Sequence, residues 1–136
     1  MLFTLPTVRT CMDTVVPTLT ADVPILQAVS FLLDRHVTDA PVVNAANEVI
    51  GMLTEKDCLK LLSLGSEQAD RPLGNVGEYM STKVTTIPPH MNVYFAAGMF
   101  LNDEVRRFPV VENGVLIGAI TRFDILRAIR AGLGDH

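Results

Sequence analysis

The chain has 136 residues, of which 49% are apolar and 19% are charged, and its formal net charge at pH 7 is −4. This length fits one compact domain with a real hydrophobic core, and the charge excludes a broad basic surface for nucleic acid or membrane. The first residues lack the basic stretch of a signal peptide, and the longest apolar run, residues 93–101, is too short to span a bilayer. We therefore expect a cytoplasmic protein. The high apolar content indicates either a buried interface between subunits or a well-filled core.

The sequence repeats itself. Shifting it by 68 positions, and by 67 after one residue drops out of a loop, aligns sixteen identical residues between positions 8–62 and the second half. Ordinary composition would give roughly three such matches by chance. We therefore divide the chain into a first repeat with its lead-in (1–62), a linker (63–75), a second repeat (76–130) and a fraying tail (131–136).

Each repeat is predicted to begin with a short extended segment, residues 15–19 or 84–87, whose use as a central strand is limited by proline. A helix follows, with Asp22 or Asn92 as its N-cap and apolar residues at three- and four-residue spacing. Two short apolar strands joined by a polar turn come next, which is typical of a hairpin. These strands span residues 40–43, 49–53, 108–111 and 115–120.

A second helix is predicted to start at Thr54 or Thr121, so each repeat has the order strand, helix, strand, strand, helix. The fold class is therefore α/β (α+β). A three-stranded sheet with two helices on one face cannot cover its other face alone. We expect the two repeats to pack together through their sheets.

The start of the second helix carries the same motif in both repeats. Residues 51–57 and 118–124 both have the pattern Gly-x-x-Thr-x-x-Asp, and each follows an apolar-Pro-Val-Val strand. Thr-x-x-Asp at a strand-to-helix junction fits a capping box, in which the hydroxyl and the carboxylate accept hydrogen bonds from early amides. The same groups also suit the ribose and phosphate oxygens of a nucleotide. Both interpretations stay open, and one does not exclude the other.

With two motifs in register, and with Met12 or Met80 opening each repeat, the chain resembles the CBS (cystathionine-β-synthase) domain pair, or Bateman module, over about residues 8–130. The resemblance implies a stand-alone regulatory module that binds an adenine nucleotide and modulates an unidentified effector protein. It also implies a homodimer of two domain pairs. AMP, ADP or ATP is the expected ligand, NAD and S-adenosylmethionine are also compatible, and no cofactor or metal is required.

Basic residues distinguish the second repeat from the first. Arg106 and Arg107 precede Phe108-Pro109, and Arg122 lies inside the second motif, whereas the matching positions of the first repeat are Thr38, Asp39 and Glu55. The planar guanidinium suits two phosphate oxygens, and the resemblance places such residues beside the ligand phosphates. The alternative is a pair of arginines on a solvated surface.

Asp39 would repel a phosphate unless a cation or Lys56 offset its charge. We therefore predict one good nucleotide site in the second repeat and a weak or empty one in the first. The resemblance places adenine beside Thr18 and Ala40-Pro41, or beside Thr86 and Phe108-Pro109. The residues expected to contact ligand are Thr86, Arg106, Arg107, Phe108, Pro109, Thr121, Arg122 and Asp124, and, in the first repeat, Thr18, Asp39, Ala40, Pro41, Thr54, Lys56 and Asp57.

No catalytic pattern is evident. The three histidines are not at metal-ligand spacing, Cys11 and Cys58 form no CxxC pair, and no Walker loop or nucleophile elbow occurs. A nucleotide hydrolase or kinase would need a base and a metal site, so we predict a protein that is not an enzyme. Free thiols indicate a reducing compartment. The alternative to a ligand sensor is a structural dimerisation module whose stability ignores nucleotides.

Overall fold

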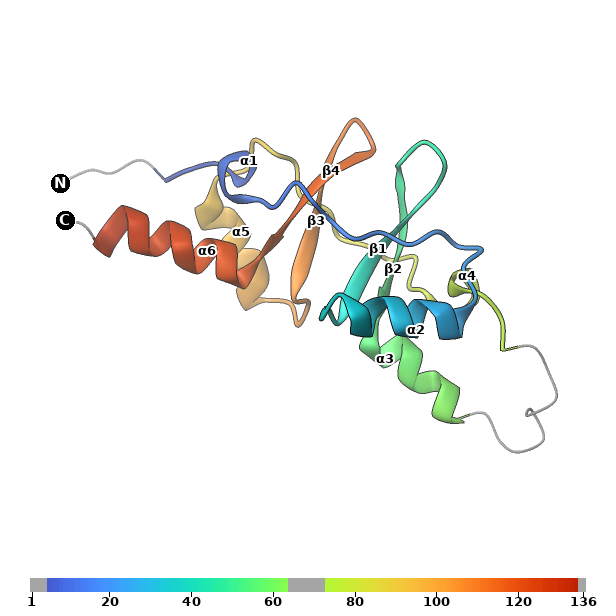
Figure 1. The fold of residues 1–136 in the computed structure, drawn as a ribbon. Helices are drawn as coiled ribbons and strands as arrows, with labels where there is room; N and C mark the ends of the chain where they lie inside the picture. Colours follow the sequence, from blue (N-terminus) through green and yellow to red (C-terminus); the bar gives the residue numbers. More distant parts are fainter. Residues whose placement is uncertain (1–4, 64–72, 135–136) are drawn as a thin grey trace. The chain divides into compact units, whose positions relative to one another are not determined.

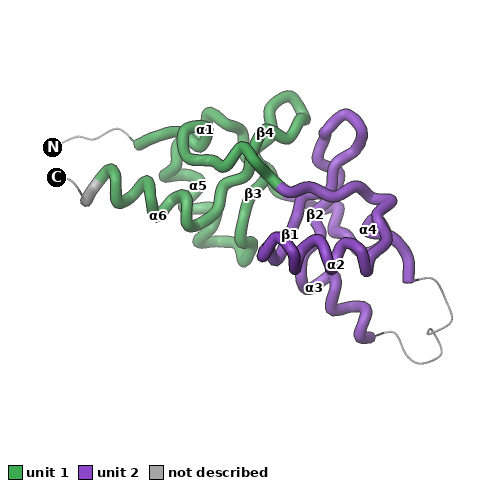
Figure 2. Tube along the Cα trace, viewed as in Figure 1, with its two compact units in different colours: residues 1–16, 85–136 green, residues 17–84 purple. Residues whose placement is uncertain are grey.

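The computed structural model describes residues 5–63 and 73–134. Most of the predicted linker, residues 64–72, lies outside the described residues, as do residues 1–4 and 135–136. The chain forms two compact units: unit 1 is Met1–Val16 with Thr85–His136, and unit 2 is Pro17–Val84 (Figure 2). Each unit combines helices with an antiparallel strand pair, so the predicted α+β fold class is confirmed.

The elements of the two units correspond one to one (Figure 1). Unit 2 contains α2 (Ile25–Asp34), β1 (Asp39–Val43), β2 (Val49–Thr54), α3 (Glu55–Leu59), the 3₁₀ helix η1 (Lys60–Ser63) and α4 (Val76–Tyr79). Unit 1 contains α1 (Val8–Cys11), α5 (Val93–Leu101), β3 (Arg107–Glu112), β4 (Val115–Thr121), α6 (Arg122–Ile129) and the π-helical turn η3 (Arg130–Gly134). Residues 131–134 of the predicted tail thus continue α6 for another turn. None of the helices in the described part of the chain is long and apolar enough to cross a membrane.

Both predicted hairpins form, and their turns differ in length. In the β3–β4 hairpin, Glu112 pairs with Val115, and Asn113 and Gly114 have φ values of 53° and 82°. Two residues with positive φ are what a tight hairpin turn requires. The β1–β2 turn is longer, which accounts for the change of offset between the repeats.

The extended segment predicted at the start of each repeat forms only a single parallel bridge, and not a full strand. Leu19 bridges to Val42, and Ile87 bridges to Val110. Pro17 and Pro89 lie two residues from the bridging Leu19 and Ile87, where the next N–H facing the hairpin would be, and both lack it, so the ladder ends there. Each bridge nevertheless adds an extended row beside the first strand of its hairpin.

The two predicted helix caps have different outcomes. Asn92 caps α5, because its Oδ1 accepts a hydrogen bond from the Tyr94 N–H at 2.7 Å. The prediction for Asp22 is wrong: Pro24 occupies the N-cap of α2, and the Asp22 carboxylate instead accepts a hydrogen bond from the Thr20 hydroxyl at 2.6 Å.

Each hairpin is completed by the segment that opens the other repeat, here called its lead-in, which is residues 8–16 in the first repeat and 76–84 in the second. The lead-in of the first repeat joins unit 1, where Asp13 and Ala119 exchange two backbone hydrogen bonds of 2.9 Å. The lead-in of the second repeat joins unit 2, where Met52 and Ser81 exchange bonds of 2.9 and 3.0 Å. The repeats in the sequence and the compact units in space therefore differ by these two segments (Figure 2).

The motif glycines allow the lead-ins to approach this closely. A Cβ atom at Gly118 would lie 2.7 Å from the Met12 sulfur and 2.8 Å from the Asp13 carbonyl oxygen. At Gly51, it would lie 2.5 Å from the Met80 sulfur. No larger residue fits at either position without a shift of the lead-in. The glycine of the motif is therefore required for packing against the lead-in, and this role is independent of the threonine and the aspartate.

Each unit has its own apolar core. Phe108 is 1% exposed, and its ring lies 4.6 Å from that of Phe100. The other buried residues of this cluster are Val8, Ile87, Val93, Ala96, Val110, Ile120, Ile125 and Ala128. The cluster of unit 2 consists of Leu19, Ile25, Ala28, Leu32, Ala40, Val42, Leu53 and Val76. These cores hold the junction between the hairpin and the following helix in place.

Candidate functional site

The Gly-x-x-Thr-x-x-Asp motif lies where the hairpin of each unit enters a helix. In unit 1, Thr121 ends β4 and is the N-cap of α6, and Asp124 follows in the first turn. Ile120 and Ile125 flank the junction and are buried in the core. Packing of these neighbours therefore fixes the positions of the threonine and the aspartate.

Asp124 and Thr121 form a capping box. Oδ2 of Asp124 accepts hydrogen bonds from the backbone N–H and the hydroxyl of Thr121, at 2.8 and 3.0 Å. The Thr121 hydroxyl oxygen accepts one from the Asp124 N–H at 3.2 Å. Oδ1 forms an ion pair with Arg127. The predicted capping box is confirmed, and a carboxylate that is only 5% exposed is stabilised by three donors.

Unit 2 repeats this arrangement. Oδ2 of Asp57 accepts hydrogen bonds from the backbone N–H and the hydroxyl of Thr54, at 2.9 and 3.0 Å, and Oδ1 accepts one from Lys60 Nζ at 3.2 Å. Sequence reasoning did not single out Lys60 or Arg127. Their spacing of three residues after an aspartate on a helix was the available signal.

Cys58 lies directly after this carboxylate. Burial, and then the charge of Asp57, raise the pKa of the Cys58 thiol above its usual range. Cys58 and Cys11 lie in different units, and both are free, as predicted. The raised pKa disfavours the thiolate, which is the nucleophilic form of cysteine.

The hairpin register brings several predicted ligand residues of unit 1 to one end of the sheet. Arg107 pairs with Thr121, and Pro109 pairs with Ala119. Residues opposite each other on antiparallel strands have Cα atoms about 5 Å apart. The Ile87 bridge to β3 brings Thr86 to the same end of the hairpin. Phe108 and Pro109 are buried, so they would offer a ligand mainly their backbone.

Arg106 and Arg122, the other two arginines predicted to contact ligand, do not take part in this strand pairing. Arg106 is exposed and precedes β3. Arg122 is exposed in the first turn of α6, and its Nη2 donates a hydrogen bond to the Asp103 carbonyl oxygen at 3.2 Å. Its guanidinium also lies 5.9 Å from the centre of the Phe100 ring. Arg122 therefore ties α6 to the segment that follows α5.

The equivalent end of unit 2 differs in charge. Asp39 pairs with Thr54 in the register and is 6% exposed. It thus occupies the strand position that Arg107 has in unit 1. Ala40 and Pro41 are buried, Thr18 is half-buried beside Leu19, and Lys56 is exposed on α3. The two repeats therefore carry opposite charges at the same structural position, Asp39 in unit 2 and Arg107 in unit 1.

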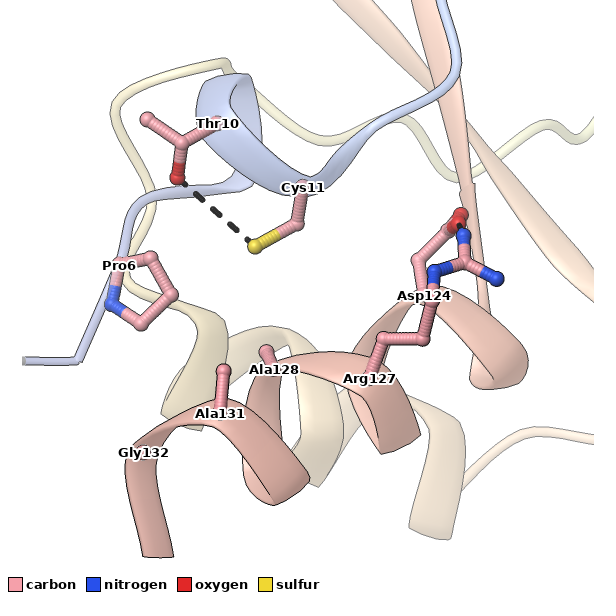
Figure 3. Close-up of a pocket in the computed structure, with 8 residues that line it drawn as sticks. All are labelled: Pro6, Thr10, Cys11, Asp124, Arg127, Ala128, Ala131 and Gly132. Atoms are coloured by element: carbon pink, nitrogen blue, oxygen red, sulfur yellow. Dashed lines mark hydrogen bonds and ion pairs between the residues drawn. The ribbon is translucent and has the colours of Figure 1, made fainter. Parts of the chain in front are cut away.

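A pocket of about 430 Å³ in unit 1 lies between α1 and the helix that carries Asp124 (Figure 3). Its lining residues are Pro6, Thr10, Cys11, Asp124, Arg127, Ala128, Ala131 and Gly132. Asp124 and Arg127 lie together at one end, and small side chains of α6 and η3 form the floor. A second pocket in unit 1, of about 340 Å³, is lined by Thr85, Phe95, Gly98, Met99, Asn102, Asp103 and Phe108. Over residues 5–63 and 73–134, no group of three or more histidine, cysteine or acidic residues is placed to hold a metal ion.

Comparison with protein families and curated proteins gives consistent matches. The family model described as the CBS domain matches residues 8–64 and 76–131. The A-adding tRNA nucleotidyltransferase of Aquifex aeolicus (strain VF5) is 30% identical over 126 residues, which are 93% of this chain and 15% of that protein. The 5′-AMP-activated protein kinase subunit gamma-3 of Sus scrofa is 30% identical over 114 residues, covering 78% of this chain and 22% of the subunit. The chain spans 15% to 63% of the length of four of its curated relatives.

Solved structures extend the comparison to the fold. CBSX2 from Arabidopsis thaliana, a CBS-pair protein, has a TM-score of 0.83 at 25% identity and covers 94% of this chain and 96% of its own. The structure of CBSX2 in complex with AMP has a TM-score of 0.81 at 25% identity, with 92% and 96% covered. The CBS domain pair of protein MJ0100, in complex with 5′-methylthioadenosine and S-adenosyl-L-methionine, has the same fold, with a TM-score of 0.77 at 20% identity and 93% and 98% covered.

Proposed function

Because the chain belongs to the CBS domain family and carries two of these domains in tandem, we propose that it is a non-catalytic regulatory module that binds an adenosine-containing ligand. The observation that carries this proposal is the AMP complex of CBSX2, which is similar over 92% of this chain. The ligands of the MJ0100 pair, 5′-methylthioadenosine and S-adenosyl-L-methionine, also contain adenosine. Adenosine is therefore the shared chemistry, and AMP, ADP, ATP, NAD and S-adenosylmethionine are the candidates.

We place the ligand at the end of the β3–β4 hairpin in unit 1. Thr121 and Asp124 would bind the ribose, because a carboxylate accepts hydrogen bonds from a diol. Arg107, which pairs with Thr121 in the register, would bind the phosphate. The backbone beside Thr86 and Pro109 would contact adenine. These roles follow from the positions of the residues and from the family resemblance.

The equivalent end of unit 2 is a poor phosphate site in this proposal. Asp39 is buried there, and a buried carboxylate repels an anion more strongly than an exposed one does. Lys56 would have to offset this charge from the exposed side of α3. We expect one occupied site per chain.

A thermal-shift screen tests the proposal. The purified chain is heated with AMP, ADP, ATP, NAD or S-adenosylmethionine, with inosine monophosphate as a control that alters the purine base. A ligand at a hundred times its Kd stabilises the folded state by about 2.7 kcal/mol, which raises Tm by several degrees. We expect such a rise with at least one adenosine compound. A folded protein that responds to none of the five would contradict the proposal.

A ligand-free dimerisation module is the second candidate. It is favoured by the two capping boxes, since Asp57 and Asp124 already have protein donors and need no ligand to be stabilised. In that case, stability would depend on protein concentration and not on nucleotides.

Either function is served by a homodimer, which we propose to form through the outer faces of the helices. In unit 1, Tyr94, Leu101, Phe123 and Leu126 are 60% to 86% exposed. In unit 2, Leu26, Leu33 and Leu59, which align with Tyr94, Leu101 and Leu126, are 57% to 68% exposed. Large apolar side chains that recur on a helix face indicate a covered surface. A second copy of this chain offers the same stripes and is therefore self-complementary.

Leu126→Glu is expected to convert this dimer into a folded monomer, because the interface would have to bury a charge. Sedimentation velocity measures the change, and Thr14→Glu, which adds the same charge at an exposed position outside the helices, is the matched control. The wild type and the control should sediment as dimers. A monomeric wild type would contradict the proposed interface.

We also propose that ligand binding acts on an effector protein, because a ligand changes the affinity of a module for its partner only if it binds the two states differently. The two free cysteines fit a reducing compartment such as the cytoplasm.

A further inference from the structure

The carboxylate of Asp124 has one oxygen left for a ligand, and a side chain of the protein already occupies it. Oδ2 accepts two hydrogen bonds from Thr121, which fill its two lone pairs. Oδ1 accepts a hydrogen bond from Arg127 Nη2. Oδ1 also has two lone pairs, of which Arg127 takes one, and a ribose diol has two O–H donors. The diol can donate both of its hydrogen bonds to Oδ1 only if Arg127 gives up its place. Ribose and Arg127 therefore seek the same acceptor.

The same arrangement occurs in unit 2, which makes it a property of the motif. Lys60 Nζ lies 3.2 Å from Oδ1 of Asp57, while Oδ2 accepts the two hydrogen bonds from Thr54. Lys60 and Arg127 align at the same offset as the two motifs. The repeats have opposite charges at Asp39 and Arg107, yet both keep a cation on this oxygen. The cation is therefore present beside the motif carboxylate in both units, whatever the charge of the residue at position 39 or 107.

Arg127 can return to water when its side chain leaves the carboxylate. Its side chain is 52% exposed, whereas that of Asp124 is 5% exposed. Displacing Arg127 costs the hydrogen bond to a buried acceptor, which a ligand donor at the same oxygen would replace. The guanidinium also lies 5.2 Å from the centre of the Phe123 ring, so it has a second partner besides the carboxylate. Asp124 and Arg127 both line the pocket in Figure 3, so there is open space beside the pair.

We propose that Arg127 is an internal competitor of the ligand's ribose, and that it sets how tightly a diol-bearing ligand binds. This inference rests on the proposed function and adds a residue that controls it. Without ligand, Arg127 donates to Oδ1 and keeps a buried acceptor paired. A ribose diol takes over this acceptor, and Arg127 moves to solvent beside Phe123. A nucleotide without the diol cannot replace the lost hydrogen bond.

Arg127→Met tests the competition, because methionine keeps an apolar stem and removes the donor. The variant leaves Oδ1 without a donor until a diol binds, which makes binding more favourable. We expect the Kd for AMP, measured by isothermal titration calorimetry, to fall about tenfold. The Kd for 2′,3′-dideoxy-AMP should not change. Without ligand, the variant should unfold at a lower urea concentration than the wild type.

Arg130→Met is the matched control, since Arg130 is an exposed arginine that begins the next turn of the same helix. It removes the same charge and should leave both Kd values unchanged. Arg127→Gln, which keeps a neutral donor, should have an intermediate Kd for AMP and provides a second variant should the methionine variant not fold.

The outcomes separate this inference from the proposed function. Unchanged or weaker AMP binding by both Arg127 variants, with AMP still bound by the wild type, overturns the competition alone. An equal gain for AMP and 2′,3′-dideoxy-AMP also overturns it, because the gain would not involve the diol. If no protein, the wild type included, binds AMP or any other adenosine ligand, the proposed function fails, and the inference fails with it.

Discussion

Gly118→Ala is expected to lower the free energy of unfolding by about 2 kcal/mol. The added Cβ atom would lie 2.8 Å from the carbonyl oxygen of Asp13, which is backbone and cannot rotate away, and 2.7 Å from the Met12 sulfur. The lead-in would have to shift, and the two hydrogen bonds between Asp13 and Ala119 would weaken. Urea denaturation followed by circular dichroism measures the loss.

Gly98→Ala is the control for this prediction. Gly98 lies within α5, and an added Cβ atom would have nothing within 4 Å. Alanine is preferred over glycine inside a helix by about 1 kcal/mol, so the control should be as stable as the wild type or more stable. Equal effects of the two substitutions would contradict the role assigned to the motif glycine.

Asp124→Ala is expected to lower the free energy of unfolding by about 1 to 2 kcal/mol and to weaken AMP binding at least about tenfold. The loss of stability arises because the N–H and the hydroxyl of Thr121 lose their acceptor, so that α6 keeps only half of its capping box. The loss of affinity arises because the proposed ribose contact disappears. Urea denaturation and calorimetry measure the two effects separately.

Asp57→Ala provides the comparison that separates the two roles. Asp57 completes the capping box of α3 with the same set of hydrogen bonds and is 7% exposed, so its loss should destabilise the protein to a similar degree. AMP binding should remain, because the ligand is proposed to bind in unit 1. If Asp57→Ala abolishes AMP binding and Asp124→Ala does not, the site lies in unit 2.

The hairpins and the capping boxes were predictable because they depend on local sequence. Short apolar strands around a polar turn, and a threonine three residues before an aspartate, specify these features within a dozen residues or so. The N-cap of α2 was mispredicted by the same local reasoning. Pro24 starts the helix without help from Asp22, whose carboxylate is engaged by Thr20.

The assignment of the lead-ins could not be predicted in this way. The segments around Met12 and Met80 have similar sequences, so local preference does not tell which hairpin each will join. The pairing of Asp13 with Ala119 joins residues more than a hundred positions apart, and such contacts depend on the whole chain.

For the candidate site, the sequence identified the residue types but not their register. From the sequence, Arg106 and Arg107 were equally good candidates for a phosphate contact. In the structure, β3 begins at Arg107, so only Arg107 pairs with Thr121. Arg127 escaped notice because a basic residue near a helix end is common and is usually solvated. Its contact with Oδ1 of Asp124 becomes visible only in the structure.

Isothermal titration of AMP into the purified chain measures most directly whether this CBS pair binds an adenosine ligand. We predict saturable binding of one AMP per chain, lost in Asp124→Ala and kept in Asp57→Ala. No saturable heat with AMP, nor with ADP, ATP, NAD or S-adenosylmethionine, from protein shown to be folded, would contradict ligand binding and favour the structural dimerisation module.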